Sequence, residues 1–269
     1  MNLVQQHFVS SQSNGLRPET LLFVQNSNQT IPSVIDALNV CFGALIDSEL
    51  WNKIHCFYPN AGATQFNHAF NAKAPFNNDA SFRKVYYGDI FSDVNGDLGN
   101  GNGYANSFFI PAYNQTLLNN GITVCVGTQN TPLSNQVYEL GIYDSATSSS
   151  LFSSKYASNN EISVIQLNGN ALTFDFGGNT KGLYTLNREN AVQSIYKNKS
   201  FITSGFANGT LTAYPIYIHV INLYNAGVLG YSNQRIQSTL FHSNLSNTEI
   251  LQLQTIIDTF ENSLGRKTW

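Results

Sequence analysis

Short segments of alternating apolar and polar residues follow one another after Pro59. In residues 122–126 and 172–176 every second residue is apolar, which predicts strands with one buried face and one polar face. Gly, Asn and Asp residues separate the segments, as is typical of strands joined by turns. The segments are residues 82–87, 105–110, 122–128, 136–143, 162–166, 171–176, 183–188, 191–197, 216–223 and 236–242. Together they predict a mainly all-β protein built as a two-sheet antiparallel sandwich.

Two further segments have the three- and four-residue apolar spacing of a helix that packs on a core. The first begins near Pro32 and carries Val34, Leu38, Phe42, Leu45 and Ile46. The second begins at Ser246, because Ser246 and Glu249 have the spacing of a capping box, and Gly265 is expected to end it. Its apolar stripe consists of Ile250, Leu253, Ile256, Ile257, Phe260 and Leu264. We expect one helix before the sandwich and one after it, both packed on it.

The expected domain organisation is an N-terminal arm, residues 1–30, followed by one sandwich domain with flanking helices, residues 31–269. The arm is rich in Gln, Asn and Ser, and its one apolar run is residues 21–24. Such a segment either docks through that run or stays mobile.

Charge and composition exclude several classes of protein. Charged residues make up only 11% of the chain, and the formal net charge is -3 with no basic run, so nucleic-acid binding is not expected. We find no apolar stretch long enough for a membrane span and no signal peptide at the start of the chain, which predicts synthesis in the cytoplasm without export. Cys41, Cys56 and Cys125 lie in apolar stretches without C-x-x-C spacing and are expected to be buried free thiols.

Local sequence offers little support for catalysis. The five histidines have no zinc-binding spacing, and no G-x-S-x-G or phosphate-loop motif is present. Sandwich glycosidases use paired carboxylates, whereas Glu139 and Asp144 have opposite strand parity and Asp175 lies between two phenylalanines. We therefore expect a protein that is not an enzyme. A glycan-cleaving sandwich with carboxylates from different strands remains the enzymatic alternative.

Asp93, Asn95 and Asp97 form a D-x-N-G-D segment, which places three oxygen-bearing side chains of the kind that calcium prefers close together. The segment lacks the bidentate Glu of an EF-hand. It predicts either a single-ion calcium site or a plain turn between strands. Calcium is the one cofactor that the sequence suggests.

Tyrosines recur beside Gly- and Asn-rich turns. A Tyr ring can stack on a sugar while neighbouring amides bond its hydroxyls, so these positions are candidate glycan contacts. The alternative is that they close the rim of the sandwich core. The predicted glycan site comprises Tyr104, Tyr224, Asn225, Tyr231 and Asn233, and Tyr86 and Tyr87 share the same pattern.

From about residue 30 to the end, the chain resembles concanavalin A-like, laminin-G-like jelly-roll proteins found in virions of tailed bacteriophages. The most specific motifs are G-Y-S-N-Q-R-I at 230–236, L-S-N-T-E at 245–249 and F-E-N-S-L-G-R at 260–266; L-W-N-K-I-H-C-F-Y-P at 50–59, N-G-Y-A at 102–105 and P-I-Y-I at 215–218 also match. The turn at Asn198 and Lys199 departs from the family's usual Asn-Gly. The resemblance assigns structural roles to Trp51, Tyr231, Ser232, Asn233, Arg235, Gly265 and Arg266.

The resemblance implies a non-enzymatic structural protein exposed on the capsid or tail of a phage particle. Its expected partners are other virion proteins and further copies of itself, as a homo-oligomer, and its expected location is the virion. Adhesion to a host-surface glycan is a further role that the resemblance implies. The alternative is a lectin-like receptor-binding module.

Overall fold

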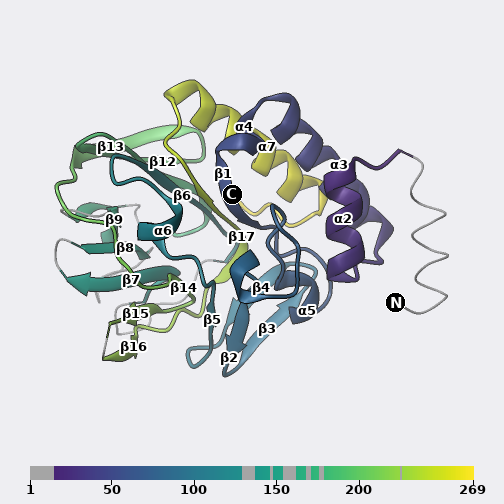
Figure 1. Ribbon diagram of the computed structural model, residues 1–269, viewed down its shortest axis with the longest axis horizontal. Coiled ribbons are helices and arrows are strands. Elements are labelled where there is room, and N and C mark those ends of the chain that lie inside the picture. Colours follow the sequence, from purple (N-terminus) through teal and green to yellow (C-terminus); the bar gives the residue numbers. More distant parts are fainter. Residues whose placement is uncertain are drawn as a thin grey trace.

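The computed structural model describes residues 15–128, 137–145, 148–153, 162–167, 171–175, 179–224 and 226–269 (Figure 1). The helices are α2 (Pro18–Ser27), α3 (Pro32–Asp47), α4 (Leu50–Lys53), α5 (Gln65–His68), the 3-10 turn η1 (Asp79–Ser81), α6 (Pro111–Asn114) and α7 (Asn247–Ser263). The strands are β1 (Ile54–Tyr58), β2 (Val85–Tyr87), β3 (Ile90–Asp93), β4 (Gly96–Gly99), β5 (Tyr104–Asn106), β6 (Asn119–Val126), β7 (Leu140–Ser145), β8 (Ser148–Ser153), β9 (Ile162–Leu167), β10 (Leu172–Asp175), β11 (Gly182–Glu189), β12 (Val192–Lys197), β13 (Ser200–Phe206), β14 (Tyr217–Ile218), β15 (Ile221–Leu223), β16 (Gly227–Leu229) and β17 (Arg235–His242).

The strands form two sheets, which we call sheet A and sheet B. Sheet A has the order β13-β12-β11-β6-β17-β4-β3, and β1 pairs with β17 beside β4. Sheet B has the order β10-β9-β8-β7-β14-β5-β2, and β15 joins it by a parallel pairing with β7. The two-sheet sandwich flanked by helices that the sequence predicts is confirmed.

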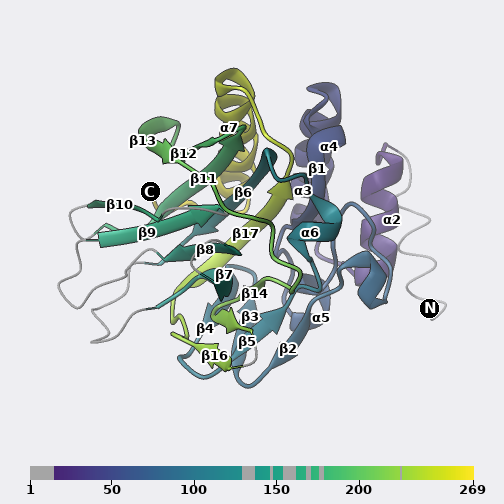
Figure 2. The same ribbon diagram turned by 60° about the vertical axis from the view of Figure 1, so that its left-hand side comes forward.

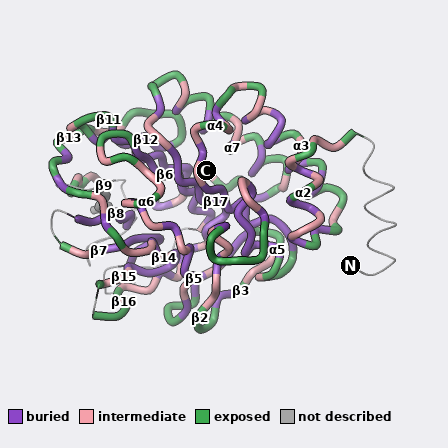
Figure 3. Tube along the Cα trace, in the orientation of Figure 1, coloured by how far each residue is buried: buried purple, intermediate pink, exposed green. Residues whose placement is uncertain are grey.

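The protein has three layers, because the helices α3 and α7 cover the face of sheet A that is turned away from sheet B (Figure 2). Residues of β6 show how the layers are filled. Ile122, Val124 and Val126 pack in the core between the two sheets, whereas Cys125 packs in a second core under the helices. The polar face predicted for this strand is therefore buried as well, and its Thr123 bonds to Thr185. In Figure 3 the central strands are accordingly coloured as buried.

Both predicted helices are present. Pro32 occupies the first turn of α3, where its missing N–H costs nothing, and the apolar face of α3 packs against α7. Ser246 caps α7 in a complete capping box with Glu249, and Gly265 follows the helix with φ of 68°, the left-handed conformation that favours glycine. These local signals explain why the sequence predicts both helices closely.

The described part of the N-terminal arm is residues 15–30, and it contains α2. Phe23 and Val24 of the predicted apolar run are buried, and the Phe23 ring meets Phe42 of α3 edge-on, with 5.8 Å between centroids. This run therefore docks α2 on α3.

No helix within the described ranges is long and apolar enough to cross a membrane.

Several strands differ from their predicted bounds. The segment expected as one strand over 216–223 is divided into β14 and β15, because His219 adopts a positive φ of 70° between them. The strand β8 was missed, since its serines are buried without the apolar alternation that marks a strand. The turn at Asn198 and Lys199 joins β12 and β13 in a hairpin, and both residues have positive φ.

Candidate functional site: a tyrosine ladder on sheet B

Tyrosines from three neighbouring strands stack in a row on the outer face of sheet B. Tyr87 of β2 lies opposite Tyr104 of β5 in the strand register, and Tyr217 of β14 lies on the other side of Tyr104. The ring centroids of Tyr104 are 5.0 Å from those of both neighbours, and the planes are inclined by only 16° and 17°. We call these residues, together with Tyr231, the tyrosine ladder.

The strand pleat sets the direction of the ladder. Ala105 and Ile218 pack in the core between the sheets, so their neighbours Tyr104 and Tyr217 point to the outer face. The strands β2, β5 and β14 lie together in the lower half of Figure 1. The ladder is thus turned away from sheet A and its helices.

Exposure differs along the ladder. Tyr87 is 44% exposed, whereas Tyr104, Tyr217 and Tyr231 are half-buried. The Tyr231 ring lies 6.4 Å from that of Tyr104 at an angle of 50°. Because Tyr104 has a ring stacked on either side, Tyr87 presents the most accessible aromatic surface to a ligand.

Polar groups border the exposed end of the ladder. Tyr87 leads into Gly88 and Asp89, and the Asn102 amide donates a hydrogen bond to the Asp89 carboxylate at 3.3 Å. The two turns approach closely: a Cβ on Gly88 would lie 2.5 Å from the Asn102 carbonyl oxygen, so only glycine fits there. Exposed carboxylate and amide groups therefore lie in the turns directly after Tyr87 and before Tyr104, and such groups are suited to bonding sugar hydroxyls.

Tyr86, which shares the sequence pattern of Tyr87, has a different role. Its hydroxyl donates to Asp97 Oδ2 at 2.8 Å, linking β2 of sheet B to β4 of sheet A. Burial first of all, and then the neighbouring Asp97, raises the pKa of Tyr86 well above its usual value. Tyr86 is therefore one of the tyrosines that close the core, and it supports Tyr87 from inside.

Asp97 lies at the centre of a buried polar network. Lys84 Nζ is 2.8 Å from Oδ2, and His68 Nδ1 and Ser92 Oγ are 2.7 Å and 2.5 Å from Oδ1. Burial alone would raise the pKa of Asp97, but the Lys84 charge and then His68 hold it well below its usual value. The carboxylate is therefore ionised and fully occupied by donors from this chain.

The structure does not bring Asp93, Asn95 and Asp97 together as one set of calcium ligands. Asp97 points into the buried network, whereas Asp93 forms an ion pair with Arg235 at 2.6 Å and accepts the Asn95 backbone N–H at 2.7 Å. The segment is the turn of the β3–β4 hairpin, which was the alternative interpretation. Within the described ranges no group of three or more His, Cys, Asp or Glu is placed to hold a metal ion.

The other predicted glycan residues are distributed around sheet B. Tyr224 stacks on Tyr214 with 3.8 Å between centroids, forming a second aromatic pair, and its hydroxyl contact is the main reason that the pKa of Tyr214 is raised to about 12. Asn233 is half-buried two residues after Tyr231. Asn225 lies outside the described residues. Of the predicted set, the structure unites Tyr104 and Tyr231.

Sequence reasoning missed Tyr217 as a site residue. The signal was present, because Tyr217 alternates with the apolar Ile216 and Ile218, which predicts an outward side chain. Its stacking on Tyr104 could not be foreseen, since it depends on the pairing of β14 with β5.

The residues with expected structural roles do hold elements together. Arg235 donates to the Gly96 carbonyl as well as to Asp93, pinning the β3–β4 turn to β17. The Trp51 ring packs against Phe42 and lies under Lys73 Nζ at 4.5 Å. The Ser232 hydroxyl accepts the Gln234 backbone N–H at 3.1 Å within the turn before β17.

Arg266 is 2% exposed and holds the end of the chain to the edge of sheet A. Its guanidinium donates to the carbonyl oxygens of Pro59 and Asn60 at 2.8 Å each and to that of Gln237 at 3.1 Å. It also pairs with the fully buried carboxylate of Glu261 on α7. The C-terminal motif thus secures the helix layer to β1 and β17.

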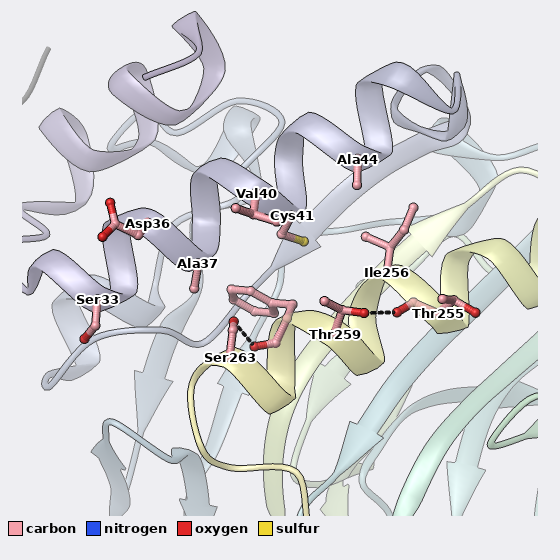
Figure 4. Close-up of a pocket in the computed structure, with 11 residues that line it drawn as sticks. Ser33, Asp36, Ala37, Val40, Cys41, Ala44, Thr255, Ile256, Thr259 and Ser263 are labelled. Carbon is pink, nitrogen blue, oxygen red and sulfur yellow. Dashed lines mark hydrogen bonds between the residues drawn. The ribbon is translucent and has the colours of Figure 1, made fainter. Parts of the chain in front are cut away.

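Two grooves lie away from the ladder. One, of about 380 Å³, runs between α3 and α7, and its Thr255, Thr259 and Ser263 hydroxyls donate to carbonyls of their own helix (Figure 4). The other, of about 750 Å³, lies over β11–β13 beside α7, and Phe201 and several amide and hydroxyl groups line it. The first groove is mainly apolar, whereas the second combines a ring with polar groups.

No family model matches the chain, and no curated protein matches it in sequence. Its fold does match solved structures. One is that of a botulinum neurotoxin type C protein whose cell entry depends on interaction with two ganglioside molecules, with a TM-score of 0.55 and 11% identity over 78% of this chain. Another is the binding domain of botulinum neurotoxin DC in complex with SialylT, with a TM-score of 0.51 and 11% identity over 77% of this chain. A third is the serotype C1 binding domain, with a TM-score of 0.51, 12% identity and 77% coverage.

The chain spans about half the length of these structures, 52%, 52% and 53% respectively. At this level of identity the likeness concerns the fold. The chain has the concanavalin A-like sandwich that the sequence predicts, in the form shared with these toxin binding domains.

Proposed function

We propose that this chain is a lectin-like module that binds glycans through the tyrosine ladder, without catalysing a reaction. The observation that carries the proposal is the row of stacked rings on the outer face of sheet B. Its most exposed ring, Tyr87, ends the strand that leads into the turn with Asp89, and Asp89 is bonded to Asn102. Aromatic faces and convergent polar groups are the two elements of sugar recognition.

The structural neighbours add support of a general kind. Two of them are described by their interaction with gangliosides or with SialylT, so this sandwich occurs in proteins that bind sialylated glycans. The proposal for this chain concerns carbohydrate as a class, and a host-surface glycan is the specific ligand that we would examine first.

The test is binding of the purified protein to an array of bacterial surface glycans, with and without calcium. We expect Tyr87→Ala to weaken binding of a positive glycan about tenfold, the effect of one lost aromatic contact of roughly 1.4 kcal/mol. The matched control is Tyr143→Ala, which removes another exposed tyrosine of sheet B. Equal affinities of the two variants would refute the ladder as the site.

Binding that survives in Tyr87→Ala but fails in Phe201→Ala would move the site to the groove over β11–β13. The absence of catalysis is checked separately. Release of reducing ends from a bound bacterial polysaccharide would contradict it.

A place in a phage particle, with other virion proteins or further copies of this chain as partners, is the finer part of the proposal. It rests on the sequence motifs alone. Peptide mass spectrometry of purified particles tests it, and failure to find the chain there would leave glycan binding without a virion role.

A further inference from the structure

Lys84, Asn60 and Asp97 meet in the interior, and all three residues are 0% exposed. Lys84 Nζ lies 2.7 Å from Asn60 Oδ1 and 2.8 Å from Asp97 Oδ2. The rings of Tyr58 and Tyr86 each lie 5.1 Å from the same nitrogen. A primary amine, a carboxamide and a carboxylate are therefore enclosed together in a space that the rings shield from water.

We propose that Lys84 and Asn60 become joined by an intramolecular amide bond, formed by the folded protein itself. Lys84 Nζ attacks the Asn60 side-chain carbonyl carbon, and the new C–N bond forms as the bond from that carbon to Nδ2 breaks. The amide nitrogen leaves as ammonium, taking up the two protons that the Lys84 ammonium loses as it becomes an amide N–H. The step is an exchange of one amide for another, so no oxidant, reductant or cofactor is needed.

The surroundings of Lys84 provide what the attack requires. An amine is nucleophilic only after it loses a proton, and burial, the largest cause, lowers the pKa of Lys84 against the opposing effect of Asp97. Asp97 is ionised and is in contact with Nζ, so it is placed to accept that proton and return it to the leaving nitrogen. His68 and Ser92 hold the carboxylate in position from its other oxygen.

Asn60, whose side-chain carbonyl carbon is the electrophile, is held in place by hydrogen bonds. Its Nδ2 donates to the Ile236 carbonyl at 3.0 Å, while its own backbone carbonyl accepts from Arg266 at 2.8 Å. Its carboxamide therefore cannot swing away from Lys84 without breaking a buried hydrogen bond. Lys84 Nζ is held 2.7 Å from Asn60 Oδ1, the oxygen bonded to the carbon that it would attack, and holding the two groups together in this way supplies much of the rate advantage that such a reaction needs.

The bond would link the segment after β1 to the residue before β2, closing a loop between positions 60 and 84. All three cysteines of the chain are free, so this amide would be a covalent brace that works in a reducing compartment.

The test is the intact mass of the purified, denatured full chain. We expect it to be lighter than the sequence mass by one ammonia, and a tryptic digest to contain a branched peptide joining the segments with Asn60 and Lys84. A chain of full sequence mass would overturn the proposal. A chain one water lighter, with Lys84 joined to Asp97, would overturn the assignment of Asn60.

Variants check the roles of the three groups. Lys84→Arg keeps a cation beside Asp97, and Asn60→Ala removes the carbonyl, so both should have full mass; Asp97→Asn should react at least tenfold more slowly. The matched control, Lys73→Arg, changes a lysine that donates to the Trp51 carbonyl and should still lose ammonia. Ammonia loss in Lys84→Arg would place the reaction elsewhere in the chain and refute the proposal.

Discussion

Replacing Arg266 by methionine removes the guanidinium that connects α7 to β1 and β17, and keeps a side chain of similar length. The change leaves the Glu261 carboxylate, which is 0% exposed, without its cation. It also removes the donor from the carbonyl groups of Pro59, Asn60 and Gln237.

The expected cost follows from those losses. Breaking a buried ion pair by removing one partner costs about 3–5 kcal/mol, because the remaining charge stays desolvated. For a domain of this size, each kcal/mol lowers the melting temperature by about 2–4 °C, so we expect Arg266→Met to melt roughly 10 °C below the natural chain.

A second variant separates the charge from the packing. In Glu261→Gln with Arg266→Met no uncompensated charge is left, so the double variant should be more stable than Arg266→Met alone by roughly 1–3 kcal/mol. The control is Lys267→Met, which removes a partly exposed partner of Asp258 and should cost less than about 1 kcal/mol.

Urea unfolding followed by circular dichroism gives the free energies of unfolding. If Arg266→Met cost no more than Lys267→Met, or if the double variant were the least stable of the three, the buried pair would not secure the helix layer as argued.

Three further outcomes are expected. Burial lowers the pKa of His219 and of His242 to about 4, so between pH 6.5 and 4 the unfolded chain binds more protons than the folded one. As the pH is lowered through this range, the free energy of unfolding should fall by about 1.4 kcal/mol per histidine for each pH unit. Urea midpoints that stay level over this range would contradict the expectation. Ser246→Ala removes the cap of α7 and should cost about 1 kcal/mol in the same assay, whereas a loss below about 0.3 kcal/mol would show that the cap is unimportant. Asp93→Ala should lower the melting temperature, because Arg235 loses its partner. Its glycan affinity should equal that of the natural chain with or without calcium. A calcium-dependent loss of affinity would instead support the predicted calcium site.

The parts of the fold that the sequence predicts well are those with local signals. The capping box at Ser246, the proline at the start of α3 and the turn at Asn198 each determine structure within a few residues. The strand β8 has no such signal, since Ser149 and Ser153 are buried although serine is usually exposed, and the Ser153 hydroxyl is satisfied by the Val137 carbonyl.

The residues of the candidate site were likewise predictable only in part from the sequence. Tyr104 and Tyr231 could be selected because tyrosines beside Gly-rich turns are recognisable in the sequence. The identity of the most exposed ring depended on strand pairing, which placed Tyr104 between two others and left Tyr87 at the end. Asp97 was selected as a metal ligand because it belongs to the D-x-N-G-D segment. Its actual partners Lys84 and His68 are distant in sequence, so only folding shows that they occupy its oxygens.

The burial of all three cysteines has a practical consequence. Burial is the main cause that raises the pKa of each thiol well above its usual value, so almost no thiolate is available to a maleimide or to oxidants in the native protein. A single cysteine introduced at Val40, which is 64% exposed on α3, would then be the reactive position. A fluorophore attached there would lie on the helix layer, with both sheets between it and the tyrosine ladder, so the label would leave the ladder free for a ligand.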